Sequence, residues 1–286
     1  LKTDIEEFMD NHQQLLLRYR FLPENIWNFD ETMIGKQNLT KGSQDKDDPV
    51  PCQADEKMAE HITLGLWTSA AGQWLTPLAI FPLKTVPPLA QSVLDHFHIA
   101  GQPAGWIDKD ILLEIVENFF VHEMNTRRAD RNEPVLLIMD GHTSRISLTP
   151  EKAAMLWNGH KIIISLMPAH SSALLQPLDL SVNGEFKKVF SRRFQHIKNE
   201  PAPDRRNRLM QIAQRVLTRV NNVDCICYGW EHSGLWPFRK DLVLKSTMLT
   251  QTTANQPEVE TGKKRKRGPK MNKGKVLYNG LTEHIV

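Results

Sequence analysis

The sequence predicts an α/β fold in which helices flank one mixed sheet. Residues 62–69 and 74–81 are two β-type runs separated by four turn-type residues, a pattern typical of a hairpin. Further along the chain, helical patterns alternate with a continuous apolar run at 135–139, typical of a strand covered on both faces, and with a second buried strand predicted at 161–167. Hairpin strands followed by alternating helices and strands give a mixed sheet with helices packed on it.

The N-terminal elements follow from apolar spacing. Apolar residues at helical spacing predict a helix over 4–20, which Asp4 can cap and Pro23 ends. Residues 25–32 alternate apolar and polar side chains and predict a short strand that ends in acids. The polar residues 40–60 predict a mobile insertion.

The later elements are mainly helical. The proline-rich stretch 82–104 is expected to be irregular, and Asp108 can then cap a long amphipathic helix. A short helix is predicted from Thr149 onward, another from 180 to about 198, and a third over 204–220.

Composition limits the class of protein. The chain has 286 residues, of which 40% are apolar, enough for a core of one large or two small domains. No window approaches the roughly 18 uninterrupted apolar residues of a membrane span, so no membrane partner is expected. Three cysteines form no disulfide framework and no signal peptide is recognisable, which indicates an intracellular protein. The first residue is Leu1 rather than Met, as expected of a fragment.

Positive charge gathers at the C-terminal end of the chain. Residues 261–286 hold eight basic residues and one acid, a net charge of +7, so with +3 for the whole chain the rest carries −4. Residues 246–286 are also poor in apolar side chains, which predicts a basic, disordered tail.

Three acids stand where such a sheet would place a site. Asp30 is expected to end the first strand, Asp140 to end the strand 135–139, and Asp179 to open the helix after the last strand. Carboxylates brought together in this way suit Mg²⁺, a hard cation that prefers oxygen ligands, and two ions roughly 3.5–4 Å apart need several of them.

Each acid also has a structural reading that the residues alone leave open. Asp140 and Gly141 form a turn-type pair after a strand, and Asp30 could lie in a polar loop. Asp179 is a good N-cap for a helix that begins at Leu180.

The residues around the acids resemble a known family. Residues 28–32 (Asn-Phe-Asp-Glu-Thr), 139–144 (Met-Asp-Gly-His-Thr-Ser) and 176–182 (Gln-Pro-Leu-Asp-Leu-Ser-Val) are similar to the DDE-superfamily transposase domain of the pogo, Tigger and jerky type. The segments 61–63, 105–108, 167–172 and 234–238 are similar to that family too, and the resemblance covers about residues 5–240 in order.

The resemblance implies a ribonuclease-H-like fold and a metal-dependent DNA endonuclease and strand-transferase. Residues 1–24 would lead into a catalytic domain at 25–245, in which Asp30, Asp140 and Asp179 are the catalytic acids and hold two Mg²⁺ or Mn²⁺ ions. The family cleaves transposon ends hydrolytically, and the freed 3′-hydroxyl then attacks target DNA.

The match to the family pattern is not complete. Ala169 stands where the family usually has proline, and the 38 residues between Asp140 and Asp179 are a somewhat long gap. Glu185 is a less favoured third acid because it falls outside the third motif.

A basic stretch follows the third acid. Ten basic residues against two acids between 186 and 219 favour binding of a double-stranded DNA backbone, and the first four, Lys187, Lys188, Arg192 and Arg193, are the candidate DNA-binding residues. The alternative is a solvated helix surface. Asn183 lies four residues after Asp179, on the same helix face, and is a candidate contact to metal-bound water or phosphate.

A basic run in the C-terminal tail indicates where in the cell the protein acts. Lys263, Lys264, Arg265, Lys266 and Arg267 are typical of a nuclear-localisation segment, although a DNA-contacting tail is also open. A nuclear protein is therefore expected. Family members usually carry a helix-turn-helix DNA-binding module before the catalytic domain, and this module is expected but absent from this chain. The sequence also leaves open whether the protein forms a homo-oligomer.

Two functions fit this pattern. One is an active transposase; the other is a domesticated, centromere-protein-B-like relative that binds DNA or chromatin without catalysis. Three intact acids favour the first, since carboxylates repel DNA phosphates and a binding module has no need of them. A glycosidase with a carboxylate pair would explain neither the third acid nor the basic stretch.

Overall fold

The core of the molecule is one mixed β-sheet. The computed structural model describes residues 1–35, 61–86, 88–141, 148–194, 202–246 and 275–276. The strands lie in the order β4-β3-β2-β1-β5-β6-β7, with bounds β1 Ile26–Gly35, β2 His61–Ser69, β3 Leu78–Phe81, β4 His98–Gly101, β5 Val135–Met139, β6 Ile162–Leu166 and β7 Lys275–Val276. β2 is antiparallel to β1 and β3, whereas β5 is parallel to β1 and β6, and β4 is parallel to β3. The predicted fold class, a ribonuclease-H-like mixed sheet with flanking helices, is confirmed.

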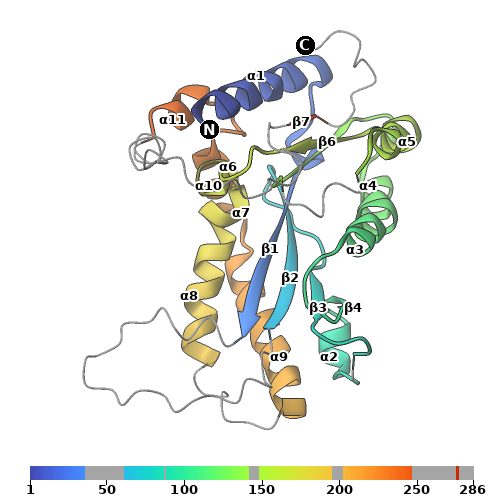
Figure 1. Cartoon of the computed structure of the whole chain (residues 1–286). Helices are drawn as coiled ribbons and strands as arrows, with labels where there is room; N and C mark the ends of the chain where they lie inside the picture. The colour runs from blue at the N-terminus through green and yellow to red at the C-terminus, as the bar shows by residue number, and fades with distance from the viewer. Residues whose placement is uncertain (36–60, 87, 142–147, 195–201, 247–274, 277–286) are drawn as a thin grey trace, which may run out of the picture.

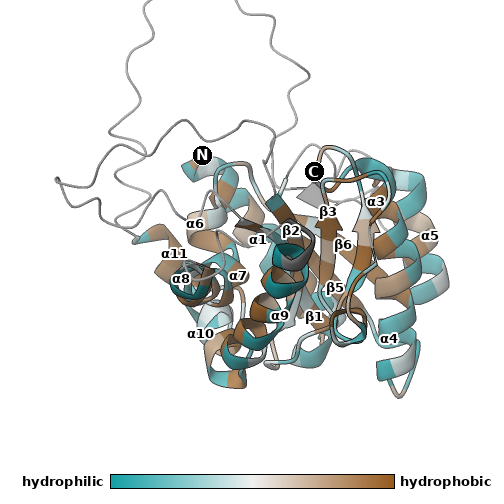
Figure 2. Cartoon of the chain, turned by 90° about the horizontal axis from the view of Figure 1, so that it is seen from below, coloured by the Kyte–Doolittle hydropathy of each residue, from teal (hydrophilic) through white to brown (hydrophobic). Residues whose placement is uncertain are grey.

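Two helical layers cover the sheet (Figures 1 and 2). One holds α6 to α10, with bounds α6 Ser172–Leu175, α7 Pro177–Leu180, α8 Val182–Phe194, α9 Ala202–Val220 and α10 Val223–Ser233. The other holds α3 Lys109–Glu114, the π-helical segment η4 Ile115–Phe120, α4 Val121–Arg127 and α5 Pro150–His160. Each layer buries its own apolar cluster against the sheet.

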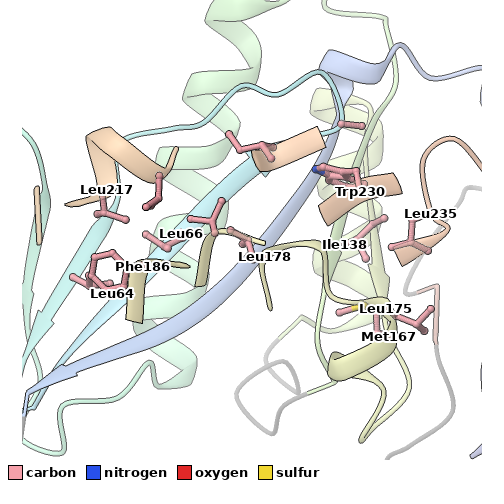
Figure 3. Close-up of a cluster of buried hydrophobic side chains, with 14 of the residues drawn as sticks. Leu64, Leu66, Ile138, Met167, Leu175, Leu178, Phe186, Leu217, Trp230 and Leu235 are labelled. Atoms are coloured by element: carbon pink, nitrogen blue, oxygen red, sulfur yellow. The ribbon is translucent and has the colours of Figure 1, made fainter. Parts of the chain in front are cut away.

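The first layer packs on leucine, isoleucine and phenylalanine side chains. Figure 3 shows Leu64 and Leu66 of β2 and Ile138 of β5 facing Leu178, Phe186 and Trp230 from the helices. The motif at 234–238 belongs to the same cluster, because Leu235 is fully buried and Trp236 and Phe238 pack against it.

The N-terminal helix α1 Lys2–Tyr19 contacts this layer through residues near the C-terminal end of the described helices, Leu235 and Lys240. The His12 ring hydrogen-bonds to the Leu235 carbonyl oxygen at 3.1 Å, and Asp10 pairs with Lys240 at the start of α11 Lys240–Leu244. Leu1 occupies the N-cap and Asp4 lies in the first turn, so the expected cap at Asp4 is wrong.

Several predicted elements are confirmed with small shifts. The hairpin is β2 and β3, the apolar runs are β5 and β6, and α5 begins after an N-cap at Thr149. Asp108 caps α3, since its Oδ1 accepts from the Asp110 and Ile111 N–H groups at 3.1 and 2.9 Å.

Other predictions are wrong. Residues 82–104 are not wholly irregular, because they form the one-turn helix α2 Gln91–Leu94 and the edge strand β4. β1 does not end in acids at 32 but continues to Gly35, since its pairing with β2 extends to Gly35 opposite His61. The single helix from 180 is two helices, α7 and α8, with Ser181 in a non-helical conformation between them.

The remaining expectations fall largely outside the described residues. These are the insertion at 40–60, most of the tail 246–286, and the basic run from Lys263 to Arg267. Within the tail, Lys275 and Val276 form β7 against β6, which differs from the fully disordered tail predicted. In the described part of the chain, no helix is both long enough and apolar enough to cross a membrane.

Candidate functional site

Asp30 and Asp179 meet on the face of the sheet that α7 and α8 cover. The Asn183 side-chain amide joins them: its Nδ2 donates to Asp30 Oδ2 at 2.7 Å and to Asp179 Oδ1 at 3.2 Å. Both carboxylates therefore lie within hydrogen-bond reach of one nitrogen atom. Two acids that are separated by nearly 150 residues in sequence form one cluster in space.

Local structure explains why these side chains converge. Along β1, alternate residues point to opposite faces, so Trp27 and Phe29 enter the α3–α5 cluster while Asp30 faces α8. Asp179 lies in the single turn of α7, and Asn183 lies in the first turn of α8.

Asp140 completes the group. It directly follows β5, and the β1–β5 register pairs Phe29 with Met139, so the next residue on each strand is one of the acids. The electrostatic effect of Asp140 on Asp30 agrees with this proximity, because the Asp140 charge helps to raise the pKa of Asp30.

The pKa of Asp30 is raised well above its ordinary value. Burial is the largest cause, since the residue is only 8% exposed, and the charges of Asp179, Asp140 and Glu31 act in the same direction. A hydrogen bond from the Glu31 N–H has the opposite, smaller effect. Crowded carboxylates of this kind are typical of functional sites.

Two further buried amides lie beside the acids. Asn28 Nδ2 donates to the Ile138 carbonyl oxygen at 3.0 Å and to Gln176 Oε1 at 3.3 Å, and Gln176 Nε2 donates to the Phe29 carbonyl oxygen at 3.2 Å. In the sequence, both residues stand out only as parts of the motifs at 28–32 and 176–182. The signal that could have drawn attention to Asn28 is its position: it is a polar amide between Trp27 and Phe29, in a strand that is expected to be buried.

The donor chemistry of the cluster suits a divalent metal ion. Three carboxylates offer hard oxygen donors, their mutual repulsion would be relieved by a cation, and the buried Asn183 Oδ1 has no hydrogen-bond partner. Within the described ranges, however, no three His, Cys, Asp or Glu side chains already stand in a metal-binding arrangement. The oxygen donors of these residues are of the type that a divalent metal ion prefers, and Asn183 holds Asp30 and Asp179 together.

The structure decides between some of the alternative readings. Asp30 lies inside a strand, so a polar loop is wrong, and Asp179 lies within α7, whose N-cap is Gln176, so it does not cap a helix at Leu180. Gly141 lies at a crowded point, because a Cβ there would stand 2.9 Å from the Met167 carbonyl oxygen, and the turn expected after it extends outside the described residues. Glu185 is exposed and pairs with Lys188 at 3.3 Å.

The four candidate DNA-binding residues lie on one helix next to the acids. Lys187, Lys188, Arg192 and Arg193 are all exposed on α8, while Phe186, Phe190 and Phe194 form its buried face. Lys187 is one turn beyond Asn183. His142, which belongs to the motif that begins at Met139, is outside the described residues, and His170 follows β6 in a left-handed conformation (φ 63°).

Comparisons with known proteins identify a family model and several relatives. Residues 59–233 match the model described as DDE superfamily endonuclease. A curated protein of Cochliobolus lunatus, named MFS-type transporter clz9, is 30% identical over 256 residues, which are 84% of this chain and 27% of that protein. The chain thus spans about a quarter of that relative's length.

Solved structures of the Mos1 transposase are also similar. The Mos1 mariner paired-end complex with Mn matches with 13% identity and a TM-score of 0.41, over 76% of this chain and 61% of that one. The Mos1 transposase catalytic domain with Raltegravir and Mg matches with 10% identity and a TM-score of 0.35, over 77% of this chain and 90% of that one.

Proposed function

The chain belongs to the DDE superfamily endonucleases, and from that premise we propose that it is a transposase domain of the pogo, Tigger and jerky type. Its reaction is cleavage at transposon ends followed by joining of the freed ends to target DNA. The observation that carries the proposal is the bridge Asp30–Asn183–Asp179, with Asp140 at the next strand end.

In this proposal Asp30, Asp140 and Asp179 hold two Mg²⁺ or Mn²⁺ ions. Bound metal ions supply Lewis-acid activation of the attacking oxygen and neutralise charge on the leaving oxygen of the phosphodiester. The protein's part is to bring three carboxylates together against their repulsion, and Asn183 orients two of them by donating to both. Burial of Asp30 keeps bulk water away from that carboxylate and strengthens its interaction with a cation.

DNA is the proposed partner, bound along α8. The exposed Lys187, Lys188, Arg192 and Arg193 offer positive charge to a phosphate backbone on the helix that also carries Asn183. We further propose that the segment from Lys263 to Arg267 directs the protein to the nucleus.

The test is a Mn²⁺ titration by calorimetry combined with plasmid nicking. Asp140→Asn removes one ligand charge without changing volume, and Glu185→Gln is a matched control at an exposed acid of α8. We expect the wild type and Glu185→Gln to bind Mn²⁺ and nick DNA. Nicking by Asp140→Asn should fall about a thousandfold or more, because the loss of metal binding removes several kcal/mol of transition-state stabilisation.

Two results would contradict the proposal in different ways. Undiminished nicking by Asp140→Asn would show that the site is assigned to the wrong residues. No Mn²⁺ binding by the folded wild type would favour the domesticated relative, which binds DNA or chromatin without catalysis.

A further inference from the structure

Two fully buried amide side chains, Asn28 and Gln176, connect three parts of the fold. Asn28 lies in β1, and Gln176 lies at the N-cap of α7. Their bonds reach the backbone of β1, of β5 and of α7. We call the two side chains together the amide lock.

All four polar atoms of the amide lock are used. Asn28 Nδ2 donates to the Ile138 carbonyl oxygen and to Gln176 Oε1, and Asn28 Oδ1 accepts from the Leu178 N–H at 3.3 Å. Gln176 Nε2 donates to the Phe29 carbonyl oxygen. A buried amide that loses its partners is costly, so the set tolerates one relative placement of β1, β5 and α7.

The backbone groups that the amide lock contacts lie beside the three acids. Phe29 directly precedes Asp30, Leu178 directly precedes Asp179, and Ile138 is two residues before Asp140. Each bond therefore fixes the main chain within two residues of a proposed metal ligand.

The short helix α7 needs such a restraint. It has four residues, and a single helical turn is unstable without tertiary contacts because nucleation costs more than one turn returns. On its other side α10 approaches closely, since a Cβ on Gly229 would stand 2.2 Å from the Pro177 carbonyl oxygen. The helix α7, which carries Asp179, is thus held between the backbone of α10 and the amide lock.

We propose that Asn28 and Gln176 are positioning residues that set the placement of the three acids, chiefly by fixing α7 on β1 and β5. This inference rests on the proposed function, because it assigns the amide lock to the metal site. A purely structural role would affect stability without changing the site specifically.

The test uses Gln176→Met, which keeps the length of the side chain and removes its hydrogen bonds. Met124→Ala is the matched control, because Met124 is equally buried but lies in α4, on the opposite face of the sheet. Amide hydrogen exchange of residues 178–181, Mn²⁺ affinity and the urea midpoint are measured on each folded protein. We expect Gln176→Met to speed exchange at Leu178 at least about tenfold and to weaken Mn²⁺ binding about 10–100-fold.

The control should lower the urea midpoint while both site readouts stay within about twofold of wild type. If Gln176→Met does not fold, Asn28→Leu with Gln176→Met replaces both amides together and leaves neither without its side-chain partner. Wild-type exchange and wild-type Mn²⁺ affinity in a folded variant would overturn the inference. If the wild type binds no Mn²⁺, the proposed function fails, while amide exchange at 178–181 still decides whether the amide lock fixes α7.

Discussion

The two faces of β1 are built from different chemistry. On one face Trp27 and Phe29 join an aromatic cluster, in which the Phe29 and Trp67 rings lie 4.2 Å apart and Trp67 stacks on Phe120 at 5.1 Å. On the other face Asn28 and Asp30 make the polar contacts of the site. Alternate residues of β1 thus belong either to the apolar core or to the polar site.

This contrast indicates how the fold tolerates a destabilising site. The crowded carboxylates repel one another on their side of the strand, whereas the aromatic face offers a large, close-packed area that holds β1 in place. Gly65 of β2 belongs to this arrangement, because a Cβ there would meet the Phe29 ring at 2.9 Å. The aromatic face thus provides packing that holds β1, and the polar face carries the side chains of the proposed site.

The largest expected effect comes from the aromatic face. Phe29→Ala should lower the free energy of unfolding by about 3–5 kcal/mol, because it leaves a cavity beside the Trp67 ring. Urea unfolding followed by tryptophan fluorescence measures this loss, with Asp30→Asn, one residue away, as the comparison. Equal losses in the two variants would mean that the faces are not energetically different.

The next effect concerns an ionisable ring buried on the site-bearing side. Burial lowers the pKa of His12 to about 4, so the folded protein keeps the ring neutral while the unfolded chain protonates it below pH 6.5. The stabilising contribution is complete above pH 6.5 and is lost as the pH falls toward 4, about 2 kcal/mol by pH 5. Urea midpoints at pH 7.5 and 5 should differ less in His12→Gln, and an unchanged difference would exclude His12 as the cause.

A smaller effect of opposite sign is expected at Asp30. Its pKa is raised in the folded state, so the metal-free protein loses stability as the pH rises above the ordinary pKa of an aspartate. Asp30→Asn should therefore raise the thermal midpoint of the metal-free protein at pH 7.5 and leave it nearly unchanged at pH 3.5. A lower midpoint at neutral pH would show that the charged carboxylate stabilises the fold.

The smallest effect distinguishes the surfaces of the two helical layers. Arg192→Ala on α8 should weaken binding of a random duplex a few-fold and reduce the slope of log affinity against log salt by about 1. Arg127→Ala on α4, in the opposite layer, should change neither value. Fluorescence anisotropy at several salt concentrations measures the affinity and its salt dependence. Equal effects of the two substitutions would show that DNA does not bind preferentially along α8.

Local signals in the sequence were sufficient for some elements. The apolar run at 135–139 and the cap at Asp108 were predicted correctly, because burial on both faces and capping are visible in neighbouring residues. The strand β4 was missed, since its four residues lie at an edge and none of them is fully buried. The length of β1 was missed because β2, more than 25 residues later, sustains its pairing.

The site divides in the same way. Motifs were enough to single out Asp30, Asp140 and Asp179, and helical spacing from Asp179 singled out Asn183. The structure brings Asp30, Asp179 and Asn183 into contact. The bond between Asn28 and Gln176 joins residues 148 apart in the sequence, and the break at Ser181 lies where Gly229 of α10 packs against it. No local pattern encodes either contact.

The docking of α1 has a consequence for synthesis of the protein. The His12 ring meets the Leu235 carbonyl oxygen 223 residues later in the chain, and Asp10 pairs with Lys240. At translation rates of about 5–20 residues per second, α1 leaves the ribosome on the order of tens of seconds before these partners exist. Its apolar stripe of Ile5, Phe8, Met9 and Leu15 is then open to chaperones, so the closing step of folding awaits the last helix.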